Sequence, residues 1–172
     1  MTRRLIVNAD DFGLTRGVSA GILAARRHGI VTSTTVLVTA APDSDQLAEA
    51  RDAGLGIGLH VNLTLGRPLT GARSLVDPAG RFVRDARQAA ARAEAKDVER
   101  EVAAQIDRFL ALLRRPPTHL DTHHHVGLHA PVTGVVLAAA RRLGVPVRSQ
   151  NALARARARS AGLRTPDHFF GE

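Results

Sequence analysis

The chain has 172 residues, of which 44% are hydrophobic and 23% charged, and its formal net charge is +8. This composition is typical of a folded globular chain and excludes a disordered or fibrous protein, while the length favours a single domain over residues 1–172. Because the sequence has no cysteine, disulfides and thiolate chemistry are excluded, and any metal would have to be held by histidine and carboxylate side chains.

The positive charge raises the question of a nucleic-acid or membrane partner. The densest basic run, Arg155, Arg157 and Arg159, alternates with alanine and lacks interleaved aromatic residues, so we expect no nucleic-acid partner. The apolar run 5–7 is too short for a signal peptide, and no stretch approaches the roughly 18 apolar residues of a membrane span. We therefore expect a cytoplasmic protein without a membrane partner.

Short runs rich in leucine, isoleucine, valine and threonine alternate along the chain with stretches whose apolar residues recur at helical spacing. The predicted strands are residues 4–9, 33–39, 55–63, 118–122 and 145–148. The predicted helices lie between Thr15 and Gly29 and at residues 43–53, 98–113 and 131–143. Residues 64–92 are rich in glycine and proline, and we expect them to form an excursion over the active-site end that could help bind substrate.

Alternating strands and helices predict an α/β fold with a parallel sheet and right-handed crossovers. A complete eight-stranded β/α barrel typically needs about 250 residues. With about five strands in 172 residues, a barrel of this kind would be incomplete.

Carboxylate and imidazole side chains occur at the ends of three predicted strands. Asp10 and Asp11 follow the first strand, His60 lies near the end of the third, and His123 begins a histidine triplet after the fourth. Parallel sheets place their active sites at the carboxyl ends of the strands, so we expect these residues to meet. Alternation in extended backbone predicts that Asp10 and Asp11 point to opposite sides, so that one can bind a metal while the other stays free.

The histidine triplet follows Asp121 directly. Alternation predicts that His123 and His125 share a side with Asp121 and that His124 points away. Asp121 could then orient an imidazole by accepting its second N–H, although a strand-end carboxylate without a partner is the ordinary alternative.

One carboxylate and two neutral imidazoles suit a divalent ion. Zn²⁺ fits this set with open positions for water and substrate, and Mg²⁺, Mn²⁺ and Fe²⁺ also remain open. The same set serves non-haem iron oxygenases, but the parallel β/α pattern and the adjacent aspartates count against that class. Each of these residues also has an ordinary structural role: Asp10 and Asp11 could cap the following helix, and His60 could form a hydrogen bond to the backbone.

Four segments in order resemble the YdjC-like carbohydrate deacetylase family, to which chitooligosaccharide deacetylases and hopanoid-associated proteins belong. They are residues 5–14 (LIVNADDFGL), 29–35 (GIVTSTT), 58–60 (GLH) and 118–126 (THLDTHHHV). The resemblance runs from residue 4 to about 148, and residues 166–171 (PDHFFG) are also similar to the family.

The resemblance implies an irregular β/α barrel that removes N-acetyl groups from amino sugars or oligosaccharides by attack of a water activated by a divalent metal. It implies Asp11, His60 and His123 as metal ligands and Asp10 as the catalytic base.

The resemblance also implies that the family's general acid is a histidine in a His-Pro motif nearer the C-terminus, and residues 1–172 contain no such pair. We therefore expect a chain that lacks the C-terminal part of the barrel, with open strand edges that favour a homo-oligomer. His125 or His129 could supply the proton instead. Otherwise the chain is a catalytically impaired fragment that binds sugar and metal.

Overall fold

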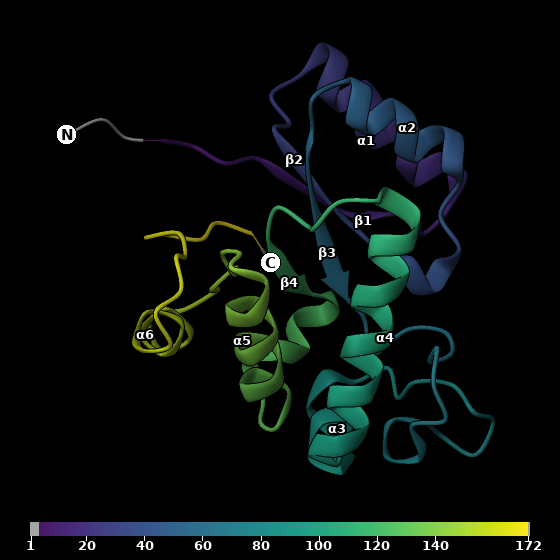
Figure 1. Cartoon of the computed structure of the whole chain (residues 1–172), viewed down its shortest axis with the longest axis vertical. Coiled ribbons are helices and arrows are strands. Elements are labelled where there is room, and N and C mark those ends of the chain that lie inside the picture. The colour runs from purple at the N-terminus through teal and green to yellow at the C-terminus, as the bar shows by residue number, and fades with distance from the viewer. Residues whose placement is uncertain (1–3, 172) are drawn as a thin grey trace.

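A parallel sheet lies at the centre of the protein, whose computed structural model describes residues 4–171. Its four strands have the order β1-β2-β3-β4, and every neighbouring pair is parallel (Figure 1). The strands are β1 (Asn8–Phe12), β2 (Ser33–Val36), β3 (Gly56–Val61) and β4 (Leu120–Thr122). The α/β class and the parallel sheet predicted from the sequence are confirmed.

Helices α1 to α4 lie between the strands in the chain, and two more helices follow β4. They are α1 (Arg16–His28), α2 (Ser44–Asp52), α3 (Ala86–Arg92), α4 (Ala95–Leu113), α5 (Val132–Leu143) and α6 (Ala152–Ser160), with short 3₁₀ turns at Val38–Ala40, Arg73–Leu75 and His123–Leu128. Thr15 caps α1 as predicted, since its side chain accepts a hydrogen bond from the backbone N–H of Val18 at 3.1 Å. No helix in residues 4–171 is both long and apolar enough to cross a membrane.

Four elements differ from the sequence-based expectation. The first strand lies at Asn8–Phe12 rather than at residues 4–9, because ladder pairing with β2 begins only at Asn8, while Leu5 and Ile6 remain exposed. The aspartate pair therefore lies inside this strand instead of following it. The fifth predicted strand is reduced to a single parallel bridge between Leu120 and Val147. The short helices α3 and α6 were not predicted.

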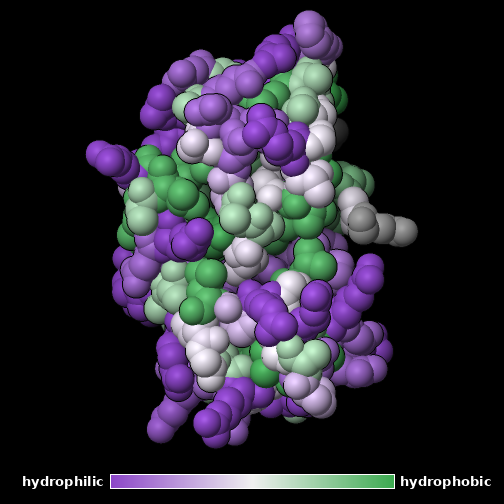
Figure 2. Space-filling view, turned by 90° about the vertical axis from the view of Figure 1, so that its right-hand side faces the viewer, coloured by the Kyte–Doolittle hydropathy of each residue, from purple (hydrophilic) through white to green (hydrophobic). Residues whose placement is uncertain are grey.

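Apolar side chains of the sheet and of the surrounding helices form the core. Phe12, Leu59, Phe109 and Leu120 are fully buried. Ala158 of α6 belongs to the same buried cluster, so the chain after residue 150 packs on the common core. Over the face that Figure 2 presents, hydrophilic side chains border and separate the apolar ones.

Polar side chains of the strands form a second, hydrogen-bonded set. Asn8 Oδ1 accepts a hydrogen bond from Ser33 Oγ at 2.6 Å and lies 3.1 Å from His119 Nε2, while Asn8 Nδ2 donates to Asp10 Oδ1 at 2.7 Å. Gly58 makes room for this set, because a Cβ at that position would lie 2.7–2.8 Å from three atoms of the His119 ring. The polar network therefore leads along the sheet to the aspartate pair.

Two buried side chains of α4 hold the excursion that follows β3. Gln105 donates to Asn62 O at 2.7 Å and accepts from Asn62 N at 2.9 Å. Glu101 accepts hydrogen bonds from the backbone N–H groups of Leu69 and Thr70 and from the Thr70 hydroxyl, at 2.8–3.1 Å. The chain just beyond His60 is therefore fixed to α4.

Candidate metal centre

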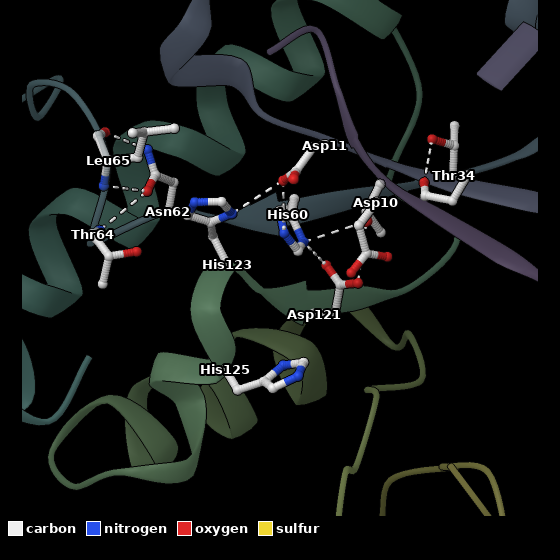
Figure 3. Close-up of polar contacts among 12 residues, drawn as sticks. Asp10, Asp11, Thr34, His60, Asn62, Thr64, Leu65, Asp121, His123 and His125 are labelled. Atoms are coloured by element: carbon white, nitrogen blue, oxygen red, sulfur yellow. Dashed lines mark hydrogen bonds and ion pairs between the residues drawn. The ribbon is translucent and has the colours of Figure 1, made fainter. Parts of the chain in front are cut away.

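Three side chains from different strand ends converge at one point. Asp11 comes from β1, His60 from β3, and His123 from the first position after β4. Asp11 Oδ1 lies 3.3 Å from His60 Nε2 and 3.0 Å from His123 Nδ1, and the dashed lines in Figure 3 join Asp11 to both rings. Both histidine side chains are buried, with 3% and 7% of their surface exposed, whereas that of Asp11 is 31% exposed. The expectation that these three residues meet is confirmed.

A local irregularity in β1 aims Asp11 at the histidines. Its φ angle is 66°, in the left-handed region, and the pairing with β2 shifts register between Ala9 and Phe12. Asp10 and Asp11 both reach His60, because each forms a group of potential ligands with it. The regular alternation assumed for Asp10 and Asp11 is interrupted at Asp11, and the two carboxylates enter different groups with His60, Asp11 together with His123 and Asp10 together with Asp121.

His60 is held between two carboxylates. Its Nδ1 lies 2.5 Å from Asp121 Oδ1, and Asp121 Oδ2 accepts a hydrogen bond from the Thr35 hydroxyl at 3.1 Å. Burial of the ring opposes its charged form, but Asp121 and Asp11 outweigh this and raise the pKa of His60 to about 10. Hydrogen bonds from His123 and His60 hold the pKa of Asp11 far below its usual value despite partial burial. The centre thus favours a positive charge between Asp11 and His60.

The donor atoms fit a metal ion. A proton on Nδ1 of His60 that is donated to Asp121 leaves Nε2 with a lone pair directed at Asp11, and only a proton or a cation makes that approach favourable. His123 Nε2 is also buried and has no hydrogen-bond partner in the described part of the chain. Separations of 3.0–3.3 Å match the spacing of about 3.3 Å between tetrahedral ligands whose bonds are about 2.0–2.1 Å long.

Arg148 is a site residue that the sequence reasoning missed. Its guanidinium donates to both oxygens of Asp10 at 2.6 Å and lies 2.7 Å from Asp121 Oδ2. Although burial would raise the pKa of Asp10, the ion pair with Arg148 lowers it. Arg148 is the last residue of the predicted fifth strand, so the rule of carboxyl strand ends could have found it. An arginine is not a metal ligand, and a search for ligand residues passes over it.

His125 does not join the three converging residues (Figure 3). The strand ends at Thr122, and His124 and His125 both have positive φ angles, so the predicted alternation does not extend through the triplet. The His125 ring instead contacts Gln150 Nε2 at 3.2 Å and the Phe169 ring at a centroid distance of 5.8 Å. The prediction that His125 shares a side with Asp121 is therefore not supported by the backbone, which turns into a 3₁₀ segment.

The parallel sheet and the three converging residues define an α/β protein with a candidate metal centre at the carboxyl ends of its strands. A family model described as "YdjC-like protein" matches residues 4–172, and the chain belongs to this family.

Curated relatives agree with this assignment. The chain is 43% identical over 172 residues to a carbohydrate deacetylase of Geobacillus stearothermophilus, covering 99% of this chain and 67% of the relative. It is 39% identical to a chitooligosaccharide deacetylase of Serratia marcescens, covering 96% and 66%, and 41% identical to one of Yersinia enterocolitica, covering 86% and 60%. The chain thus spans about three fifths to two thirds of the length of these relatives.

Two solved structures share the fold. The crystal structure of a "putative cellobiose-phosphate cleavage protein" of Enterococcus faecalis has a TM-score of 0.88 and 36% identity, covering 98% of this chain and 68% of its own. A lactam utilization protein of Thermus thermophilus, at 18% identity and a TM-score of 0.61 over 95% and 65% of the two chains, shows similarity of fold alone.

Proposed function

We propose that this chain carries the metal centre of a carbohydrate deacetylase, which hydrolyses N-acetyl groups of amino sugars or oligosaccharides. The observation that carries the proposal is the convergence of Asp11, His60 and His123 on one point, with Asp10 beside them. The names of the curated relatives, carbohydrate deacetylase and chitooligosaccharide deacetylase, support an acetylated sugar as substrate.

Asp11, His60 and His123 would hold the ion. A divalent cation bound there would polarise the acetamide carbonyl and lower the pKa of a water molecule. Asp121 would keep the His60 ring in the tautomer that directs Nε2 at the centre, because it accepts from Nδ1 at 2.5 Å.

Asp10 would act as the catalytic base. Its side chain is 34% exposed, so it is accessible to a water molecule, and Arg148 and Asn8 hold it in place. As the water oxygen bonds to the acetamide carbon, Asp10 would accept the water proton. When the carbon–nitrogen bond breaks, Asp10 would pass that proton to the leaving amine, which completes the balance without a further residue.

His125 is less suited to supply this proton. The His125 ring lies apart from the three converging residues, and burial and the nearby Arg148 cation lower its pKa. His125 would instead contribute to the rim of the site together with Phe169.

Zn²⁺ is the ion we propose in preference to Mg²⁺. Two imidazole nitrogens and one carboxylate suit zinc, whereas magnesium prefers oxygen ligands and retains several waters. In a competition with equal concentrations of both ions, followed by removal of free metal, we expect the protein to retain zinc. Retention of magnesium would contradict this choice.

Acetate release tests the function. The zinc-loaded chain should release acetate from N-acetylated chitooligosaccharides, and a chelator should abolish the release. Asp11→Asn should lose both metal and activity, whereas Asp10→Asn should keep the metal and lose activity. Asp52→Asn, a change at an exposed carboxylate remote from the site, is the control and should behave like the wild type.

Two outcomes would overturn the deacetylase proposal. Oxygen uptake without acetate would support the non-haem iron oxygenase alternative. Binding of metal and sugar without acetate release would support a chain that binds without turnover.

We also propose that the chain self-associates through the edge of its sheet. β1 is the terminal strand of the sheet order, no strand in residues 4–171 pairs with its outer side, and Leu5 and Ile6 just before it are 75% and 65% exposed. Light scattering should find a mass above that of one chain, and a uniform monomer would contradict the proposal.

A further inference from the structure

His60 belongs to two overlapping groups of potential ligands. One group is Asp11, His60 and His123, and the other is Asp10, His60 and Asp121. Within each group the ligand atoms lie within 4.8 Å of one another. The second group contains two carboxylates and one imidazole, which is also a set that binds divalent cations. Its chemistry alone therefore does not explain why an ion would prefer the first group.

The guanidinium of Arg148 engages the second group. It contacts both oxygens of Asp10 at 2.6 Å and Asp121 Oδ2 at 2.7 Å. The remaining oxygen, Asp121 Oδ1, is taken by His60 Nδ1 at 2.5 Å. All four carboxylate oxygens of this group thus have cationic or N–H partners. Within residues 4–171, the side-chain partners of the Asp11 carboxylate are the two histidine rings of its own group.

The backbone and a neighbouring ring fix Arg148 in this position. Its backbone N–H donates to Leu120 O at 3.0 Å, beside the parallel bridge between Leu120 and Val147. Its guanidinium lies 5.6 Å from the centroid of the Phe169 ring, and its side chain is only 10% exposed. The planar guanidinium can bind both oxygens of one carboxylate and still place its positive charge against a second carboxylate.

We propose that Arg148 is a positioning residue that keeps Asp10 and Asp121 out of metal coordination and so restricts the centre to one ion, held by Asp11, His60 and His123. The same guanidinium holds Asp10 at a fixed place beside that ion without allowing it to become a ligand. This inference rests on the proposed metal centre but not on deacetylation.

Metal stoichiometry tests the proposal on the purified chain. Zinc titration by calorimetry, with metal analysis after gel filtration, should give one ion per chain for the wild type and two for Arg148→Met. The double variant Arg148→Met/Asp10→Asn should return to one ion, because the second site then loses a carboxylate. Arg16→Met, which removes an exposed arginine paired with Asp43, is the control and should keep one ion.

Cobalt and a conservative variant separate positioning from a general effect on folding. The visible spectrum of the Co²⁺-loaded protein should change in Arg148→Met, because additional carboxylate joins the coordination. Arg148→Lys retains the positive charge and should therefore bind one ion. It also provides a second variant that tests the role of this charge if Arg148→Met does not fold.

Three results would count against the proposal. One ion in Arg148→Met with an unchanged cobalt spectrum would refute it, as would two ions in Arg148→Lys. A wild type that binds no ion would refute both this proposal and the metal centre. A wild type that binds one ion without releasing acetate would refute only the deacetylase function and leave the stoichiometry test decisive.

Discussion

Replacing Glu101 by glutamine should destabilise the protein strongly, although the two side chains have nearly the same shape. Glu101 is fully buried and acts only as an acceptor. Its Oε1 accepts from Leu69 N at 3.1 Å and from Gln105 Nε2 at 2.8 Å, and its Oε2 accepts from Thr70 N at 3.0 Å and Thr70 Oγ1 at 2.8 Å. A glutamine NH₂ would therefore face donors in either orientation.

The less costly orientation places the new NH₂ next to Thr70. Gln105 cannot flip its amide without breaking both of its bonds to Asn62, whereas the Thr70 hydroxyl can rotate to become an acceptor. The Thr70 N–H then stays unpaired, at a cost of about 1–3 kcal/mol, and the surviving hydrogen bonds lose the assistance of the negative charge. We expect the free energy of unfolding to fall by about 3 kcal/mol, which for a chain of this size corresponds to a Tm about 6–12 °C lower.

Urea and thermal unfolding monitored by circular dichroism measure this change. Glu99→Gln, an exposed substitution on the same helix, should shift the free energy of unfolding by no more than about 0.5 kcal/mol. A loss below about 1 kcal/mol for Glu101→Gln would refute the reasoning, because it would mean that the buried hydrogen bonds to the excursion contribute little to stability.

Three further predictions concern the polar face of the sheet. His123→Ala should lower the zinc affinity measured by calorimetry by more than about 100-fold, because changing a residue that only hydrogen-bonds to a metal ligand already lowers affinity about 10–100-fold. Unchanged affinity would exclude His123 as a ligand. The metal-free protein should lose thermal stability as the pH rises from about 6.5 towards 10, because the pKa of His60 is about 10 in the folded state and 6.5 in the unfolded state. The protonated His60 stabilises the fold fully below pH 6.5, and this stabilisation is lost as the pH rises through 10. A constant Tm over this range would contradict the prediction. Gly58→Ala should lower the free energy of unfolding by about 1–3 kcal/mol, because the new Cβ would lie 2.7–2.8 Å from atoms of the His119 ring. Gly71→Ala is the control, because no atom lies within 4 Å of a Cβ at that position. Equal Tm values for the two variants would refute the close approach at Gly58.

The convergence of the site could be predicted because it follows from topology alone. Once strands and helices alternate, the sheet is parallel, and the carboxyl ends of its strands meet at one edge. The placements of Asp11, His60 and His123 required only the approximate ends of three strands. An error of several residues in the first strand did not alter this result.

The orientation of individual side chains could not be predicted because it depends on backbone irregularities. Strict alternation fails at Asp11, where β1 bulges, and again after Thr122, where the chain turns into a 3₁₀ segment. The residues with positive φ angles at these two places, Asp11, His124 and His125, are not glycines, so their residue types do not signal the change. Arg148 could not be identified as a site residue for a different reason, because its role depends on contacts with carboxylates more than 25 residues away in sequence.

The left-handed backbone at Asp11 limits which residues evolution can place there. Aspartate and asparagine adopt this conformation more readily than most residues, because their short side chains can bond locally. Glutamate would preserve the charge but fit the backbone poorly, and asparagine would preserve the backbone but not the charge. The φ angle and the ligand chemistry together therefore favour aspartate at this position, and the φ angle makes asparagine a cleaner experimental replacement than alanine.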